Sequence, residues 1–112
     1  MIEGATAFVP AIWRLEVVNS LVVAERRKKL AQAKSDKFLQ NLQNLQKFRI
    51  KVDVEGQEHV FSAVLYQARH YQRSAYDASY LELAKRRGLP FATKDGPLSK
   101  AAEELRIAIF QP

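Results

Sequence analysis

The sequence lacks cysteine and long apolar runs, and it holds only four glycines and four prolines. Without cysteine, the chain can form neither a disulfide framework nor a thiolate metal site, which fits a reducing cytoplasm. No segment approaches the roughly 20 apolar residues that a membrane-spanning helix needs. The first residues, MIEGATAFVP, lack the basic start of a secretory signal. We therefore expect a cytoplasmic protein that does not enter a membrane.

Length and composition are typical of one small globular domain. The chain has 112 residues, of which 47% are apolar and 27% charged, so we expect a single domain over residues 1–112. The net charge is +6, and much of the excess lies in two groups of cations. These cations either surround a solvated helix end or attract a polyanion such as RNA or DNA. They are Arg26, Arg27, Lys28, Lys29, Lys34 and Lys37, followed later by Lys85, Arg86 and Arg87.

Strand-like and helix-like segments alternate along the whole chain. Short apolar runs bounded by turn residues predict strands, and apolar positions at helical spacing predict helices. This order predicts an α/β fold, a three-layer sandwich with a mainly parallel sheet, in which sites gather beyond the carboxyl ends of the strands. The expected strands cover residues 5–9, 49–54, 91–93 and 107–110, and the expected helices cover residues 11–30, 35–46, 58–71, 75–87 and 98–105.

Glu16 is the most informative acidic residue. It lies in the segment IWRLEVVNSLVV, which is apolar on most of its circumference, so we expect this helix to be buried on more than one side. An ionised carboxylate there is costly unless it is paired or binds a cation. Asn19, three residues later, shares its face. The alternative is that Glu16 pairs with Arg14 or another arginine, or faces solvent.

Asp77 and Asp95 each have an ordinary explanation as parts of helix caps. Ser74 and Asp77 have the spacing of a capping box in which Ser74 is the N-cap. Asp95 precedes Gly and Pro, which is turn chemistry, and it could cap the helix that follows. Thr93 would point to the same side as Asp95 if the strand before it extended that far. A capping role and a role in a site both remain open for these aspartates.

In a parallel α/β fold, Glu16, Asp77 and Asp95 would all lie on one rim of the sheet. Three carboxylates that converge there repel one another unless a cation is present. Such hard oxygen ligands suit Mg²⁺ or Mn²⁺, which keep most of their waters and bind through few carboxylates. An ion of this kind can activate water and stabilise charge on a phosphoryl group. The sequence thus predicts a divalent-metal site.

Two stretches carry a resemblance to a known family: VPAIWRLEVVNSLVVAERRKKL and SAYDASYLELAKRRGLPFATKDGPLSKAAEELRI. In order, spacing and apolar flanks, they resemble the PIN domain family, and within it the VapC-type ribonuclease toxins of bacterial toxin–antitoxin pairs. The resemblance runs from about residue 5 to the end of the chain. It implies that Glu16, Asp77 and Asp95 are the catalytic and metal-ligating acids. It also implies that Asn19 and Thr93 support the acidic pocket.

The resemblance further implies an N-terminal truncation. Members of the family normally begin with a strand that carries a metal-binding aspartate, and this chain starts where their second strand would be. A missing central strand leaves unpaired backbone edges, which favours strand exchange or close dimerisation. We therefore expect a PIN-like domain that is incomplete at its N-terminus and that forms a homodimer.

Three hypotheses follow for the function. The first is an Mg²⁺- or Mn²⁺-dependent endoribonuclease of the toxin type, which holds RNA through Arg14, Arg26 and Arg27 and pairs with a small antitoxin protein. The second is a catalytically inactive, truncated PIN module that acts through dimerisation or antitoxin binding. The third is a basic α/β domain whose acids are caps and ion pairs. Binding of divalent ions near Glu16 distinguishes the first hypothesis from the second.

Overall fold

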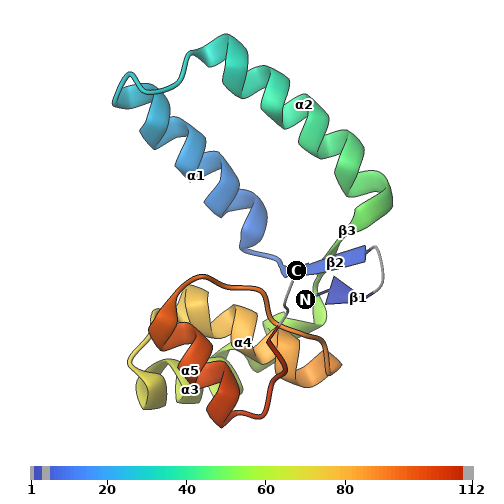
Figure 1. Ribbon diagram of the computed structural model, residues 1–112, viewed down its shortest axis with the longest axis vertical. Coiled ribbons are helices and arrows are strands. Elements are labelled where there is room, and N and C mark those ends of the chain that lie inside the picture. The colour runs from blue at the N-terminus through green and yellow to red at the C-terminus, as the bar shows by residue number, and fades with distance from the viewer. Residues whose placement is uncertain (1, 4–5, 110–112) are drawn as a thin grey trace.

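The computed structural model of the protein describes residues 2–3 and 6–109. Helices and strands alternate along the chain (Figure 1), and two of the three strand pairings in this part of it are parallel. The predicted α/β fold with a mainly parallel sheet is therefore confirmed. The strands are β1 (Ile2–Glu3), β2 (Thr6–Pro10) and β3 (Ile50–Asp53). The helices are α1 (Trp13–Arg26), α2 (Gln32–Arg49), α3 (Leu65–Tyr71), α4 (Ala75–Arg87) and α5 (Gly96–Glu104), with two short helical segments, η1 (Glu55–His59) and η2 (Val60–Val64).

The strand β2 is the centre of a three-stranded sheet with the order β1-β2-β3. It pairs antiparallel with β1 on one side and parallel with β3 on the other. The strand β3 is thus at the edge of the sheet, as its alternation of charged and apolar residues predicts. Its last residue, Asp53, is paired with Pro10, so β2 and β3 end at the same edge of the sheet.

The last two expected strands are shorter than the sequence predicts. A single parallel bridge, between Phe91 and Ile109, joins the two segments where they are described. The Phe91 N–H donates to a carbonyl of the facing segment at 2.7 Å. Two residues of the expected strands, Ala5 and Phe110, lie outside the described ranges.

The hydrophobic core lies between α4, α5 and the strand β2. The helix α4 contributes Leu81 and Leu83, which are both completely buried although residues two apart lie on different sides of a helix, so α4 is covered on more than one side. Its bounds agree with the sequence prediction, and it ends at Gly88, whose φ of 64° is the left-handed conformation that glycine adopts without strain. The core cluster consists of Phe8, Leu81, Leu83, Ala84, Leu89, Phe91, Leu98, Ala101, Ala102 and Ile107.

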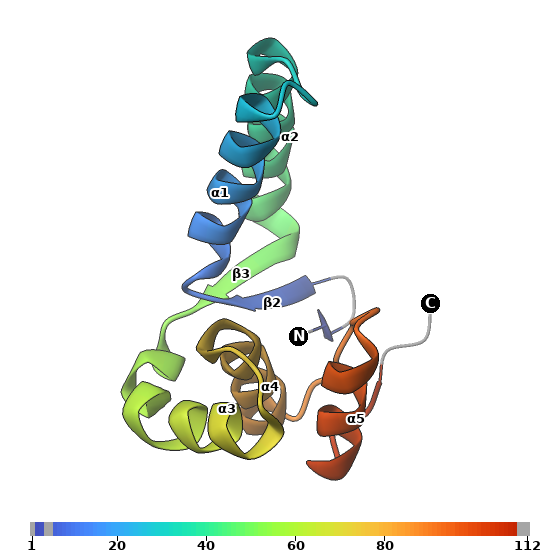
Figure 2. The same cartoon turned by 90° about the vertical axis from the view of Figure 1, so that its left-hand side faces the viewer.

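The helices α1 and α2 form a hairpin that extends away from the sheet, whereas α3, α4 and α5 lie on the other side of it (Figures 1 and 2). The helix α1 has no buried residue, so the expectation that it would be buried on more than one side is wrong for this chain taken alone. Its apolar residues remain partly or largely exposed because the hairpin projects beyond the body of the domain. No helix within the described residues is long and apolar enough to cross a membrane.

Two helices differ from their expected bounds. The helix α2 begins at Gln32, three residues before Ser35, because Gln32, Ala33 and Lys34 all favour helix. Ser35 therefore lies inside the helix and is not its N-cap. The helix expected over residues 58–71 is irregular, since it consists of a 3₁₀ segment, a π segment and α3. At its start, the Gly56 N–H donates to the Asp53 carboxylate at 2.9 Å, which accompanies the tight first turn.

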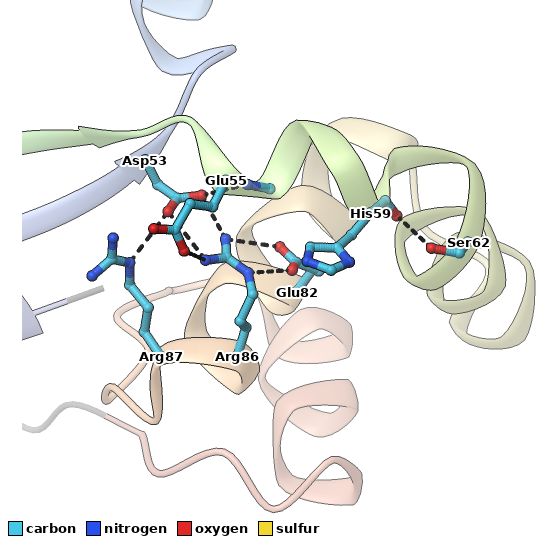
Figure 3. Close-up of polar contacts among 8 residues, drawn as sticks. Asp53, Glu55, His59, Ser62, Glu82, Arg86 and Arg87 are labelled. Atoms are coloured by element: carbon cyan, nitrogen blue, oxygen red, sulfur yellow. Dashed lines mark hydrogen bonds and ion pairs between the residues drawn. The ribbon is translucent and has the colours of Figure 1, made fainter.

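A cluster of buried charges joins β3 to α4 (Figure 3). The Asp53 side chain is 1% exposed and accepts hydrogen bonds from Arg86 at 2.5 Å and from Arg87 at 3.2 Å. Arg86 also donates to Glu82, one helical turn earlier on α4, at 2.6 Å. Two buried carboxylates thus face two guanidinium groups. Pairing of this quality is needed because an unpaired buried charge costs several kcal/mol.

The environment shifts the pKa values of this cluster in opposite directions. Burial by itself raises the pKa of Asp53, but the hydrogen bonds from Arg86, Gly56 and Arg87 outweigh it, so the pKa lies below the usual 3.8. The hydrogen bonds and charges of Glu82 and Asp53 raise the pKa of Arg86 further above its already high usual value. Both shifts keep the pair ionised at neutral pH.

We expect that Asp53→Asn lowers the free energy of unfolding by about 3–5 kcal/mol, because it removes the buried carboxylate that pairs with both Arg86 and Arg87 and leaves Glu82 as the one buried carboxylate of the described residues that faces Arg86. The lowered pKa of Asp53 adds a pH dependence, since its stabilisation is present above pH 3.8 and is lost as the pH falls through the lower folded-state value. Denaturant unfolding from pH 7 to pH 2 measures both effects. The exposed Asp36→Asn is the control, and a loss below about 0.5 kcal/mol in Asp53→Asn would contradict the prediction.

Candidate functional site

Asp77 lies in the first turn of α4, next to the predicted cap. The Ser74 hydroxyl accepts the Asp77 N–H at 3.0 Å, so the capping role of Ser74 is confirmed. This bond uses the backbone of Asp77 and not its carboxylate. The carboxylate, in a side chain that is 36% exposed, accepts from Arg73 at 3.3 and 3.4 Å. The cap therefore explains where the residue lies but not what its charged group does.

Asp95 is the N-cap of α5, which also agrees with the sequence prediction. One of its oxygens, Oδ1, accepts the Leu98 N–H at 2.9 Å. Its own N–H donates to the Thr93 hydroxyl at 3.1 Å, so Thr93 shapes the turn that presents the carboxylate. The second oxygen, Oδ2, accepts from Arg73 at 3.3 Å. Asp95 thus caps a helix with one oxygen and contacts a cation with the other.

Arg73 brings the two aspartates together. Its Nη2 atom lies 3.3 Å from Asp77 Oδ2 and 3.3 Å from Asp95 Oδ2, although these aspartates are 18 residues apart in the chain. The backbone fixes this position, because Gln72 ends α3 with a left-handed φ of 53° and the Arg73 N–H donates to a carbonyl of α3 at 3.0 Å. Arg73 is not among the site residues predicted from the sequence. Arg73 and Asp77 are four residues apart, a spacing that favours an ion pair between them on a helix. The sequence therefore offers a signal for the contact with Asp77 but not for the contact with Asp95.

Glu16 reaches the same side of α4 through Tyr80. The Tyr80 hydroxyl donates to Glu16 Oε1 at 2.5 Å, across 64 residues of sequence. Tyr80 lies three residues after Asp77, so both side chains share one face of the helix. Burial, the hydrogen bond and charge of Glu16, and the charge of Asp77 all raise the pKa of Tyr80. The phenol therefore stays protonated as a donor between two carboxylates.

The three predicted acids are thus linked through two intermediaries and do not share one centre. Within residues 2–3 and 6–109, no group of three His, Cys, Asp or Glu side chains lies close enough together to hold a metal ion. Asp77 and Asp95 are joined by Arg73, and Glu16 is joined to this region by Tyr80. One guanidinium group thus pairs with two of the three carboxylates, and the third is hydrogen-bonded to a neutral phenol.

The other predicted residues lie on the hairpin. Asn19 is exposed on α1, one turn beyond Glu16. The Arg14 guanidinium faces the side-chain amide of Gln46 on α2. Arg26 and Arg27 are exposed where α1 ends, far along the hairpin from the acids. The structure therefore gathers the acids and Thr93 around α4, and it does not bring Asn19 or these arginines into that group.

The acidic residues fit a hard divalent ion in the type and number of their donors. Magnesium commonly binds through one or two carboxylates, together with waters and substrate phosphates. Asp77 and Asp95 are such a pair, and the guanidinium between them is a cation already held at the point where they converge. The two aspartates thus share one cation, which neither would hold in this position alone.

A cavity of about 430 Å³ lies beside the acidic residues, on the neighbouring face of α4. Its lining is mostly apolar and includes Leu15, Tyr76 and Ser79. It also includes Asp53 and Glu82, whose charges are engaged by Arg86, whereas Asp77 and Asp95 do not line it. The cavity is therefore separate from the aspartate pair.

Comparison with known proteins identifies one family. A family model described as PIN domain matches residues 1–104. No curated protein and no solved structure matches the chain. The matched range includes Glu16, Asp77 and Asp95.

Proposed function

Because the chain belongs to the PIN domain family, we propose that it is a metal-dependent endoribonuclease of the toxin type. The family has a nuclease-type fold and generally uses divalent metal ions, and membership confirms the resemblance to PIN domains found in the sequence. The finer proposal is that the ion is Mg²⁺ or Mn²⁺ and that the protein hydrolyses RNA phosphodiesters. Glu16, Asp77 and Asp95 are its proposed catalytic and metal-ligating residues.

The observation that carries this proposal is the convergence of Asp77 and Asp95 on one cation. Helix capping accounts for one oxygen of Asp95 and for the backbone of Asp77, but it does not require the other oxygens to meet. They meet because α4 and the turn before α5 lie side by side, with Arg73 between them. Two carboxylates that face each other in this way are stabilised by any cation held at the same point.

Each residue of the site has a distinct proposed role. Asp77 and Asp95, with Glu16 as the third acid of the proposed set, would hold the ion, and Thr93 orients Asp95 by accepting a hydrogen bond from its N–H. Tyr80 fixes one oxygen of Glu16, which sets the direction in which the other oxygen can accept a proton or orient a water. Asn19 is proposed to support this group from the next turn of α1. When bound, the ion supplies activation of water and stabilisation of charge on a phosphoryl group.

The distribution of cations supports a polyanionic substrate. Arg73, Arg86 and Arg87 are paired with acids inside the domain. By contrast, the six cations around the turn of the hairpin form no ion pair with any residue that the structure describes. We propose that Arg26 and Arg27, together with Arg14 near Glu16, hold the RNA backbone, since such exposed cations attract phosphates. The six cations are Arg26, Arg27, Lys28, Lys29, Lys34 and Lys37.

Exposed apolar side chains favour the second candidate function, an inactive PIN module that acts by binding a second copy or a small antitoxin. Val18 on α1 and Phe38 on α2 are 46% and 50% exposed, and neither helix packs this apolar surface within the domain. Apolar surface of this kind commonly marks a protein–protein contact. We propose that a homodimer covers the hairpin in both candidate functions, and that protein, antitoxin and RNA meet in the cytoplasm.

We expect that Asp77→Asn lowers the rate of RNA cleavage in the presence of Mn²⁺ by about 100-fold or more, since each 1.36 kcal/mol of lost transition-state stabilisation is tenfold in rate. The fold should be retained, because the Asp77 ion pair is half-exposed and contributes about 0–1 kcal/mol. Cleavage of a fluorescent RNA and circular dichroism measure the two quantities.

Asp36→Asn is the matched control, since it removes an exposed carboxylate from α2. Cleavage by Asp77→Asn at the rate of the unmodified protein would end the ribonuclease proposal. A complete lack of Mn²⁺-dependent cleavage in the unmodified protein would instead favour the interaction module.

For RNA binding, we expect that Arg26→Gln with Arg27→Gln weakens the complex and makes it less sensitive to salt. The slope of log K against log salt concentration should fall by about 1.4, because each single-strand phosphate contact contributes roughly 0.7. Fluorescence anisotropy from 50 to 300 mM salt measures this slope. The control pair Lys100→Gln with Arg106→Gln removes the same charge from exposed positions elsewhere, and an equal change in both pairs would refute a specific role for the hairpin.

For self-association, we expect Phe38→Glu to shift the protein from dimer to monomer in sedimentation velocity, since it places a charge on the exposed face of α2. Phe61→Glu is the control, because Phe61 is 93% exposed but lies on η2, away from the hairpin. A dimer that persists in Phe38→Glu, or one that is disrupted equally by Phe61→Glu, would show that the hairpin is not the contact.

A further inference from the structure

Arg73 holds the point at which the two aspartates converge. The same nitrogen, Nη2, contacts one oxygen of each carboxylate at 3.3 Å, so the two oxygens lie no farther apart than twice this distance. A magnesium ion that bridged the same oxygens would lie about 2.0–2.1 Å from each of them. To do so, it would need these oxygens within about 4.2 Å of each other, and it would lie in the gap that Nη2 now bridges, so the ion and the guanidinium compete for the same two carboxylates.

The position of Arg73 is set by the fold and not by a loose surface contact. Its side chain is 24% exposed, and it leaves the backbone directly after the left-handed Gln72 that ends α3. Its Nε atom adds a third contact, to Asp77 at 3.4 Å. Without a cation here, the carboxylates would repel each other at the start of α4 and at the cap of α5. Arg73 thus stabilises the ion-free domain.

We propose that Arg73 is a resident cation that exchanges with the divalent ion, so that the ion binds only as the guanidinium leaves Asp77 and Asp95. This inference rests on the proposed function, which identifies Asp77 and Asp95 as metal ligands. It adds that Arg73 determines how readily the metal ion binds to them. Arg73 then has two opposing effects: it raises the stability of the ion-free protein, and it lowers the affinity for the divalent ion.

The test compares Arg73→Gln with the unmodified protein in Mn²⁺ titration by calorimetry and in thermal unfolding without added metal. We expect the variant to bind Mn²⁺ about tenfold more tightly, because two half-exposed ion pairs no longer compete with the ion. The ion-free variant should melt at a lower temperature, and added Mn²⁺ should raise its melting temperature by more than that of the unmodified protein. Neither measurement depends on catalysis.

Two further variants control the experiment. Arg69→Gln removes the same charge from an exposed position on α3 and should change neither property. Arg73→Lys keeps the charge but loses the planar group that contacts both carboxylates, and we expect it to bind Mn²⁺ with intermediate affinity. This second variant tests the exchange even if Arg73→Gln does not fold.

The outcomes separate this inference from the proposed function. Mn²⁺ binding that depends on Asp77 but is equally tight with and without Arg73 would overturn the exchange and leave the ribonuclease proposal standing. A lack of Asp77-dependent Mn²⁺ binding in every variant would overturn both. Binding that appears or tightens only when Arg73 is replaced supports the exchange.

Discussion

The buried pairing of Asp53 with Arg86 is the interaction on which the rest of the structure depends. It ties the end of β3 to the last turns of α4, and α4 in turn carries the core leucines, Tyr80 and Asp77. A carboxylate that is 1% exposed is tolerated only with charged partners in good geometry, so this contact allows little freedom in how α4 lies on the sheet. The position of Asp77, at the other end of the same helix, follows from that placement.

The two ends of α4 hold acidic groups that differ in how deeply they are buried. At its C-terminal end, the buried carboxylates of Asp53 and Glu82 and the exposed carboxylate of Glu55 face two guanidinium groups, and the shifted pKa values of Asp53 and Arg86 keep the pairing ionised. At its N-terminal end, Asp77 and Asp95 share the single guanidinium of Arg73, and Glu16 is held by a neutral phenol. The first group is a buried network of ion pairs that joins β3 to α4. The second group is more exposed, since the side chains of Asp77 and Asp95 are 36% and 41% exposed, against 1% for Asp53.

Local chemistry could be predicted from the sequence, whereas long-range partners could not. Ser74, Gly88 and Asp95 act as the caps that their own neighbours in the chain indicate, because capping depends on a few consecutive residues. The bridge through Arg73 and the bond from Tyr80 to Glu16 depend on how α1, α4 and the turn before α5 lie in space. Apolar periodicity predicted that α1 is a helix but not that it projects from the domain, since a pattern does not say whether its apolar face is covered by the same chain.

Gly56 shows how a charged cluster can restrict a position outside the hydrophobic core. A Cβ atom at this residue would lie 3.0 Å from Asp53 Oδ2, 3.2 Å from Arg86 Nη2 and 3.3 Å from Glu82 Oε2. The crowding atoms are the ends of paired side chains, so a methyl group would push apart oppositely charged groups that water does not reach well. A side chain at position 56 would therefore require the ends of Asp53, Arg86 and Glu82 to shift by a few tenths of an ångström, so the constraint there comes from the ion pairs and not from apolar packing.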